Sequence, residues 1–351
     1  MNVSRLKSLL LRRVLRRNGA YRDTCEKKWT ICPGETQIGP PAVYFEDDLE
    51  RVQPIDVGDT TYEQEVSRIK GGRVEHAATV AYSLKAVELI DGAIFSGAVQ
   101  HRLVDRPRHM IGRDAGESIA SAALACTPYG SIYFGHWMSD DLTLHLAAET
   151  LGVPVTVERK SYDHEPEYCR LMKIGQNKKS RLHFDELIIV DDHGQNAYKR
   201  QRYQALRSRL RESVPDAGNR YVYIRRGTVG ARVERALVNA EEIEGFLESQ
   251  GFLIVDPDHQ SASQIAESIA GARLIVGVEG SHMAHALYSV RDNGAFCILQ
   301  PPNRFTNVFK DYADCLDLRY GFTTGVEVAG GFVVDIEHLK RIVDRIDQVC
   351  A

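Results

Sequence analysis

The stretch that decides the fold class is Leu274-Ile275-Val276-Gly277-Val278-Glu279-Gly280-Ser281-His282. Residues 274–277 form an apolar, β-branched run of the kind found in buried strands. Gly280 allows a close turn of the backbone, and Ser281 is a residue type that caps the first turn of a helix. The stretch therefore predicts a strand that passes through a short loop into a helix.

The same alternation continues on both sides of this stretch. Short apolar runs at 221–224, 252–255 and 296–299 predict strands, and the segments at about 240–250, 261–271 and from 281 onward predict helices. Strands that alternate with helices form a parallel sheet with helices on both faces. We predict an α/β domain over residues 216–330 and a C-terminal helical segment over 331–351.

The N-terminal half shows a less regular pattern. Its β-prone runs lie at 78–82, 93–95, 130–135 and 184–190, and its predicted helices lie at about 139–151 and 198–214. A chain of 351 residues is too long for one ordinary hydrophobic core. We therefore predict a second α/β domain over 31–215, with the polar stretch 215–219 as the junction.

Composition excludes several classes of protein. A net charge of −4 and a pI near 6.3 argue against nucleic acid as the main partner. The seven cysteines are odd in number and contain no C-x-x-C pair, which is typical of reduced thiols in a cytoplasmic protein. No apolar run approaches the roughly 18 residues that a membrane-spanning helix needs.

Residues 1–30 form a basic N-terminal segment. Leu6, Leu9, Leu10 and Val14 fall near helical spacing between lysines and arginines, so residues 1–18 could lie on an anionic membrane surface. A frayed, solvated helix is the simpler interpretation. We expect a cytoplasmic protein, with peripheral contact at the inner face of the membrane as the alternative that this segment offers.

Two strand ends carry side chains suited to an anionic ligand. Ligands of parallel sheets bind at the carboxyl ends of the strands, and Arg225 and Arg226 follow the strand that ends at Ile224. Their guanidinium groups fit a diphosphate, although a surface salt bridge with the acids at 241–244 explains them equally well. Around Gly280, free amides at a helix start would cradle phosphate, and an ordinary capped helix is the alternative.

In chain order these segments resemble glycosyltransferase family 61. The resemblance covers roughly residues 130–300 and includes an aromatic-His-x-x-x-Asp segment, Gly135-His136-Trp137-Met138-Ser139-Asp140. The other matching segments are Tyr223-Ile224-Arg225-Arg226, Arg232, Asn239-Ala240-Glu241-Glu242-Ile243, Gly251-Phe252, Ser263-Gln264-Ile265-Ala266, Ala272-Arg273-Leu274-Ile275-Val276-Gly277, Gly280-Ser281 and Ala286-Leu287-Tyr288.

The resemblance implies a GT-B-like α/β architecture of two Rossmann-like lobes that face a cleft. It further implies an inverting hexosyl or pentosyl transferase with a nucleotide-sugar donor, most commonly a UDP-sugar. The acceptor would be a glycan or a lipid-linked glycan of cell-surface polysaccharide synthesis, as in capsule formation. Under this interpretation, residues 31–215 form the acceptor side and residues 216–330 bind the donor.

The strand ends and the resemblance together indicate a donor site. One departure affects it, because the family usually has proline-histidine where this chain has Val278-Glu279. An acid beside a diphosphate would repel it, so we expect Glu279 to accept hydrogen bonds from ribose or sugar hydroxyls. The predicted donor-binding residues are Arg225, Arg226, Arg232, Glu279, Gly280, Ser281 and His282.

His136 and Asp140 are the predicted catalytic residues. They are four residues apart, so a helix that begins near 136 places both side chains on one face. Inverting transfer needs a base for the acceptor hydroxyl, and we expect His136 to be that base and Asp140 to orient its ring or the acceptor. Asp140 as the base, or a purely structural pair that caps a helix, are the alternatives.

We expect no metal and no cofactor, because arginines and backbone amides can neutralise a departing diphosphate. The clusters Asp140-Asp141 and Asp191-Asp192-His193 could hold a cation, but consecutive acids after a strand are more often a solvated turn. Two rival functions stay open. A dinucleotide-dependent or sugar-nucleotide-modifying enzyme would need a glycine-rich first βα turn that the chain lacks, and a non-catalytic protein could share the fold.

Overall fold

The computed structural model describes residues 10, 20–53, 60–104, 117–227 and 235–350. The chain divides into two compact units, the first comprising residues 1–35 and 77–202, the second 36–76 and 203–351. The predicted boundary at 215 thus lies 13 residues beyond this division at 202. The sequence pattern also placed 36–76 with the N-terminal half, whereas the second unit includes it.

Buried polar contacts hold residues 36–76 within the second unit. Asp48 is fully buried, and its Oδ1 accepts a hydrogen bond of 2.9 Å from the backbone N–H of Thr324. Glu65 is also buried and accepts a bond of 2.6 Å from the N–H of Asn307. Each carboxylate satisfies a backbone donor that would otherwise be buried without a partner.

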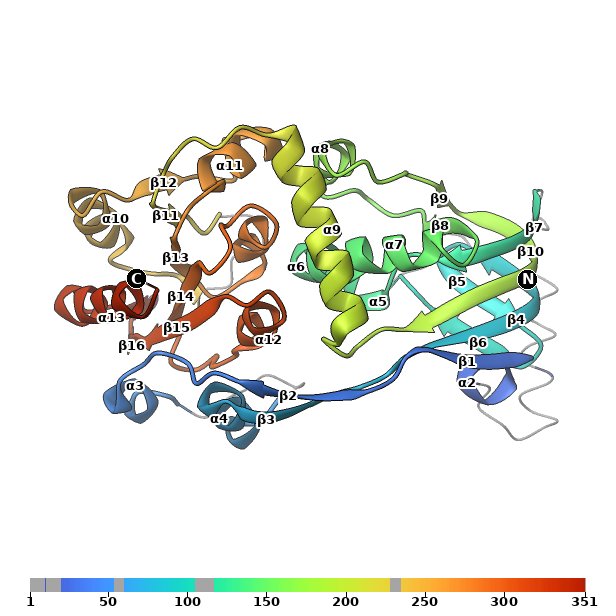
Figure 1. The fold of residues 1–351 in the computed structure, drawn as a ribbon, viewed down its shortest axis with the longest axis horizontal. Coiled ribbons are helices and arrows are strands. Elements are labelled where there is room, and N and C mark those ends of the chain that lie inside the picture. The colour runs from blue at the N-terminus through green and yellow to red at the C-terminus, as the bar shows by residue number, and fades with distance from the viewer. Residues whose placement is uncertain (1–9, 11–19, 54–59, 105–116, 228–234, 351) are drawn as a thin grey trace. The chain divides into compact units, whose positions relative to one another are not determined.

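In the described residues, the first unit is built on a mixed sheet of eight strands in the order β6-β5-β4-β10-β7-β8-β9, with β1 paired to β4 (Figure 1). Strand β4 is antiparallel to β1, β5 and β10, whereas β10, β7, β8 and β9 run parallel. The strands are β1 (Lys27–Cys32), β4 (Thr79–Ile90), β5 (Ala93–Ser96), β6 (Val99–Arg102), β7 (Ser118–Leu124), β8 (Val153–Val157), β9 (Lys178–Lys179) and β10 (Arg181–Asp191).

This mixed sheet differs from the Rossmann-like sheet expected for the N-terminal half. The cause is a pair of tight hairpins. Strands β4 and β5 are joined by Asp91 and Gly92, both at positive φ (47° and 83°), as a two-residue hairpin turn of the primed type requires. Gly97, at φ 52°, lies in the turn between β5 and β6. Such turns make neighbouring strands antiparallel.

The first unit's helices follow β7, except for α2 near the N-terminus. They are α2 (Tyr21–Thr24), α5 (Pro128–Ile132), α6 (Phe134–His136), the π-helical turn η1 (Trp137–Asp141), α7 (Leu142–Glu149) and α8 (Glu165–Leu171). The strand predicted at 130–135 is wrong, because this segment is helical. Thr127 caps α5 by accepting a 2.8 Å bond from the N–H of Gly130, and Pro128 occupies the first turn, where it fits a helix.

The second unit confirms the predicted parallel sheet, in the order β12-β11-β13-β14-β15. Its strands are β11 (Tyr221–Ile224), β12 (Leu253–Val255), β13 (Leu274–Val278), β14 (Ala295–Gln300) and β15 (Arg319–Thr324). Helices α10 (Ala240–Ser249) and α13 (Ile336–Val349) pack on the sheet face that carries Val276 and Cys297. Helix α12 (Val308–Cys315) lies on the opposite side (Figure 1), where Phe309 contacts Phe296.

The second unit contains further elements. They are β2 (Glu35–Gly39), α3 (Glu46–Glu50), α4 (Tyr62–Lys70), β3 (Gly72–His76), α11 (Ala262–Ile269), the 3-10 helix η3 (Ser281–Ala286), β16 (Val326–Val328) and β17 (Gly331–Val333). Helix α9 (Ala197–Ser213) begins in the first unit and ends in the second. The predicted cap by Ser281 is wrong, because Gly280 occupies the cap position of η3 and no side chain caps it.

All seven cysteines are free thiols, and Cys126, Cys169, Cys297 and Cys315 are buried. Burial raises the pKa of Cys126 and of Cys169 to about 12. In the part of the chain that the structure describes, no helix is long and apolar enough to cross a membrane.

The two hairpin turns allow a test of the mixed sheet. Gly92→Ala and Gly97→Ala both place a side chain at positive φ, but a Cβ at Gly92 would lie 2.8 Å from Cγ2 of Val104, whereas nothing lies within 4 Å of one at Gly97. We expect Gly92→Ala to lower the free energy of unfolding by about 1–3 kcal/mol more than Gly97→Ala, which is the usual cost of overpacking. Urea titration of both variants measures the difference, and equal losses would contradict the described turn.

Candidate functional site

A histidine, an aspartate and a lysine meet in the first unit. Nδ1 of His136 lies 2.8 Å from Oδ2 of Asp140, and Nζ of Lys199 lies 2.7 Å from the other carboxylate oxygen, Oδ1. His136 ends α6, Asp140 lies in the π-helical turn η1, and Lys199 lies in the first turn of α9. The structure thus brings together the two predicted catalytic residues and adds a lysine that the sequence did not indicate.

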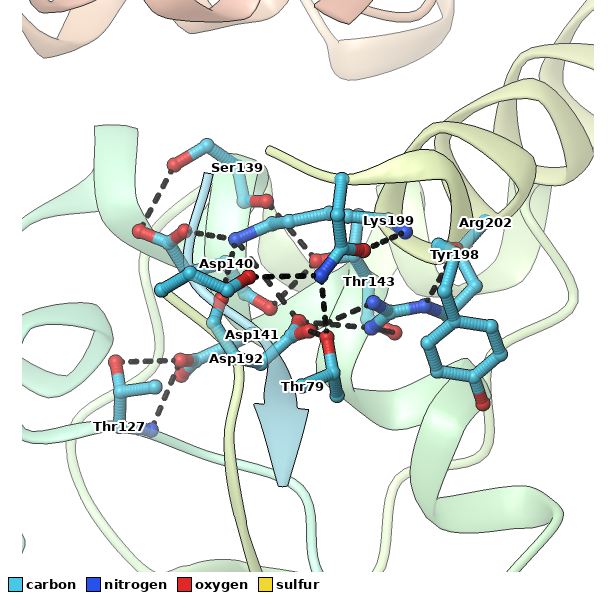
Figure 2. Close-up of polar contacts among 12 residues, drawn as sticks. Thr79, Thr127, Ser139, Asp140, Asp141, Thr143, Asp192, Tyr198, Lys199 and Arg202 are labelled. Atoms are coloured by element: carbon cyan, nitrogen blue, oxygen red, sulfur yellow. Dashed lines mark hydrogen bonds and ion pairs between the residues drawn. The ribbon is translucent and has the colours of Figure 1, made fainter. Parts of the chain in front are cut away.

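The π-helical turn gives the two consecutive aspartates different partners. The N–H of Leu142 donates to the carbonyl of Trp137, five residues back, which widens the helix by one residue at this point. Asp140 contacts Lys199, whereas Oδ1 of Asp141 accepts bonds from the N–H and hydroxyl of Thr127, at 2.9 and 2.8 Å (Figure 2). Turns of this kind are frequent at functional sites.

A buried ion-pair network extends from Lys199. Nζ of Lys199 donates to the carbonyl of Asp192 at 3.1 Å, and Arg202 binds both carboxylate oxygens of Asp192, at 2.7 and 2.8 Å (Figure 2). The side chains of Lys199, Arg202 and Asp192 are 1, 5 and 6% exposed. Because two cations and two carboxylates alternate, each charge has a partner of opposite sign, as buried charges require.

The pKa values follow from this arrangement. Burial opposes ionisation of Asp140, but the charge of Lys199 and the hydrogen bond from His136 outweigh it and lower the pKa of this carboxyl. The reverse holds for Asp141, where burial dominates the bonds from Thr127 and raises the pKa well above its ordinary value. For Lys199, burial is outweighed by the two carboxylates, so its pKa is raised. Asp140 is therefore an anion and Lys199 a cation.

Two exposed tyrosines flank the His136 ring. The ring centroids of Tyr129 and Tyr133 lie 5.3 and 6.0 Å from that of His136. The two tyrosines are 48 and 49% exposed, and Ile132 between them is 47% exposed. Two large, partly apolar side chains thus flank a half-buried imidazole, which is the composition expected of a ligand-binding surface.

The predicted donor-binding residues lie in the second unit, where the two adjacent arginines differ. Arg225 donates to Glu244 at 2.6 and 2.8 Å and to Asp256 at 2.6 Å. These carboxylates engage all three guanidinium nitrogens, and the side chain is 43% exposed. Arg225 is thus held in a surface ion pair, as one of the two interpretations of the sequence predicted.

Arg226 lies against the loop that follows β13. Its Nη1 donates to the carbonyl of Glu279 at 2.6 Å, and its Nε is buried without a hydrogen-bond partner among the described residues. Gly280 has φ 153°, and a Cβ there would collide with Nη1 of Arg226. Glycine is therefore required for the arginine to approach the backbone.

Two further arginines complete an electropositive cluster around this loop. The Glu279 carboxylate is 3.2 Å from Nε of Arg304 and 3.4 Å from Nη1 of Arg235. Burial and the charges of Arg235 and Arg304 lower the pKa of Arg226 to about 10, although Glu279 acts in the opposite direction. Two guanidinium groups thus face the Glu279 carboxylate and a third faces its backbone carbonyl, and the excess of positive charge suits an anionic ligand.

His282 borders the same cluster. Burial and the charge of Arg226 lower its pKa well below the ordinary value, so the ring is neutral, and its Nε2 is buried without a partner among the described residues. Ser281 is half-buried at the start of η3. Arg232 lies outside the described residues, as do residues 1–18 apart from Leu10.

The carboxylates that could hold a cation have protein partners. Asp191 accepts from Arg22 and Tyr21, each at 2.5 Å, and Asp192 is bound by Arg202. Asp47, Asp48 and His338 form the one metal-like group among the described residues. There, Oδ1 of Asp48 already accepts from His338 Nε2 at 2.9 Å and from a backbone N–H, so we assign this group a structural role.

Sequence reasoning missed Lys199, Arg202, Arg235 and Arg304. A signal for the first two is present in α9, where Tyr203, Leu206 and Leu210 form an apolar stripe at helical spacing. Lys199 and Arg202 lie on the same stripe, and a charge on the buried face of a helix implies a buried partner. Arg235 and Arg304 lie far from Glu279 in the sequence, and no spacing rule connects them to it.

Comparison with known proteins places these residues in a family. The two units present a buried ionic network beside a histidine and an arginine cluster at the end of a parallel sheet, which are features of an α/β enzyme. Residues 134–296 match the family model Glycosyltransferase 61. The matched range contains both predicted catalytic residues, Lys199, Arg226 and the 279–282 loop. No curated protein matches the chain. This match over residues 134–296 supports glycosyltransferase family 61, and that family implies glycosyltransferase activity with a donor and an acceptor.

The buried network makes a prediction about two neighbouring acids. Arg202→Met leaves the buried carboxylate of Asp192 without its bidentate partner, and removal of one member of a buried pair costs about 3–5 kcal/mol of stability. The matched control is Arg22→Met, because Arg22 binds Asp191 with a side chain that is 50% exposed, and exposed pairs contribute about 0–1 kcal/mol. Urea titration compares the two variants. Similar losses would contradict the buried network.

Proposed function

We propose that this glycosyltransferase moves a sugar from a nucleotide-sugar, with a UDP-sugar as the first candidate, to a hydroxyl of a glycan or lipid-linked glycan. The observation that carries the proposal is the arginine cluster at Gly280. There the main chain approaches a guanidinium group at the end of a parallel strand, which is where such sheets bind phosphate groups. A role in cell-surface polysaccharide synthesis belongs to the same proposal.

In this proposal Arg226, Arg235 and Arg304 bind the donor diphosphate. Arg226 contributes its Nε, which has no partner among the described residues, and His282 contributes a neutral ring beside it. Arg225 is left out, because Glu244 and Asp256 occupy it. Glu279 orients Arg235 and Arg304, in place of the ribose contact expected from the sequence.

His136 is the proposed base. Since Asp140 is ionised and can only accept, Nδ1 of His136 carries the proton of their 2.8 Å bond, which leaves the lone pair on Nε2. As the acceptor oxygen forms its bond to the anomeric carbon, Nε2 takes the hydroxyl proton. The bond from that carbon to the diphosphate oxygen breaks, and its electron pair leaves with the diphosphate. Attack opposite the leaving group inverts the anomeric centre, which NMR of the product would report.

The arginine cluster supplies the positive charge that the departing diphosphate needs, so we propose that transfer requires no divalent metal. The localisation is proposed as cytoplasmic, with peripheral membrane contact through residues 1–18. Sedimentation with anionic liposomes before and after deletion of these residues tests that contact, and the same sedimentation in both would contradict it.

Nucleotide binding is the first test. We expect UDP, in a panel with GDP, CMP, ADP and NAD, to raise the melting temperature in the presence of EDTA, because a ligand that binds only the folded state stabilises it. The shift should vanish in Arg226→Met and persist in the control Arg225→Met, each measured against its own ligand-free melting temperature. A shift with NAD alone, or no shift with any nucleotide, would reject the donor proposal, and a shift lost in EDTA would reject metal independence.

The tyrosines beside His136 predict how the acceptor binds. Aromatic faces stack on the apolar faces of sugar rings, and Tyr129 and Tyr133 are half-exposed beside the proposed base. In Tyr129→Ala/Tyr133→Ala we expect transfer to a glycan acceptor to fall while hydrolysis of the donor by water is retained. Tyr129→Phe/Tyr133→Phe keeps both rings and is the control. Released UDP and transferred sugar are measured together, and a parallel loss of both activities would exclude a role specific to the acceptor.

A further inference from the structure

The charged side chains of the network beside His136 carry no net charge when the imidazole is left out of the count. Lys199 and Arg202 are cations, Asp140 and Asp192 are carboxylates, and the four alternate through charge contacts of 2.7 to 3.9 Å. Lys199 is 1% exposed, so solvent screens its interaction with Asp140 very little. A second proton on His136 would therefore add an uncompensated positive charge to a neutral cluster.

We propose that Lys199 is a positioning residue that keeps the His136 ring singly protonated, with its N–H on Asp140 and Nε2 open to the acceptor hydroxyl. This inference rests on the proposed function, in which His136 is the base. Without Lys199, the Asp140 carboxylate would have one nearby group able to take up a compensating charge, the imidazole itself. The ring would then hold a proton on both nitrogens and could not accept another.

The other groups that face this cluster support the same balance. Asp140 also accepts a bond of 3.1 Å from the hydroxyl of Ser139, which is neutral. Asp141 is a further carboxyl that interacts with Asp140, and its raised pKa, caused mainly by burial, favours the neutral acid. On the α5 side, Tyr129 and Tyr133 present rings to His136, and at the start of α9 Asn196 accepts the N–H of Lys199 at 3.1 Å. None of these groups replaces the charge of Lys199.

The test reads the ring itself. The full-length protein is labelled with ¹⁵N-histidine, and the His136 signals are assigned by their absence in His136→Gln. At neutral pH we expect one protonated ring nitrogen, Nδ1, in the native protein and two in Lys199→Met. Lys199→Arg keeps the charge and should retain the native pattern. Because Lys199 is buried, its loss leaves a carboxylate without its partner, and a second variant tests the inference without that loss. Lys199→Met/Asp140→Asn restores charge neutrality, and in it the ring should again be singly protonated.

A folded Lys199→Met protein whose ring keeps the native pattern would overturn the inference, as would a doubly protonated ring in Lys199→Met/Asp140→Asn. Transfer assays add an independent readout. In Lys199→Met we expect the acidic limb of the pH–rate profile to move to higher pH, with turnover recovering there, whereas a merely structural role would lower the rate at all pH values. Retained turnover in His136→Gln would reject His136 as the base even if the NMR pattern changes as expected, so the two ideas fail separately.

Discussion

The bidentate pair between Arg202 and Asp192 is the interaction on which the first unit's site depends. It joins the residue that follows β10 to the second turn of α9, and its atoms are almost fully buried. With this contact in place, the first turn of α9 positions the Lys199 amine to donate to the Asp140 carboxylate. The same carboxylate orients the ring of His136 through a hydrogen bond. The orientation of one imidazole is thus set by a chain of charges that reaches back to the central strands of the sheet.

The candidate site of the second unit depends on a different kind of constraint. There the constraint is steric, because Arg226 can contact the carbonyl of Glu279 only where the next residue has no Cβ. The parallel strands β11 and β13 are neighbours, so their carboxyl ends lie together and bring residues 226 and 279 to one place. The match to the glycosyltransferase family 61 model spans both arrangements, since residues 134–296 include each of them.

Much of the second unit could be predicted from sequence because buried parallel strands are short apolar runs between helices, as at 221–224 and 274–277. The first unit was harder, although two of its signals were available. Asp91-Gly92 is a common hairpin dipeptide, and Thr127-Pro128 is a typical helix start.

Other parts of the site could not be predicted. The arginines at 235 and 304 meet Glu279 only through the tertiary fold, and the partner of Lys199 depends on the π-helical turn, for which we recognise no signal in the sequence. Pairings of this kind depend on how elements pack rather than on local composition.

The buried thiols have a practical consequence. Cys126 and Cys169 lie in the first unit and Cys297 and Cys315 in the second, and a buried thiol reacts with an alkylating reagent only when its surroundings open. Each unit therefore carries its own chemical reporter of opening. The rate of modification at each thiol, read by mass spectrometry, would give a separate opening free energy for each unit and show whether ligand binding tightens one unit or both.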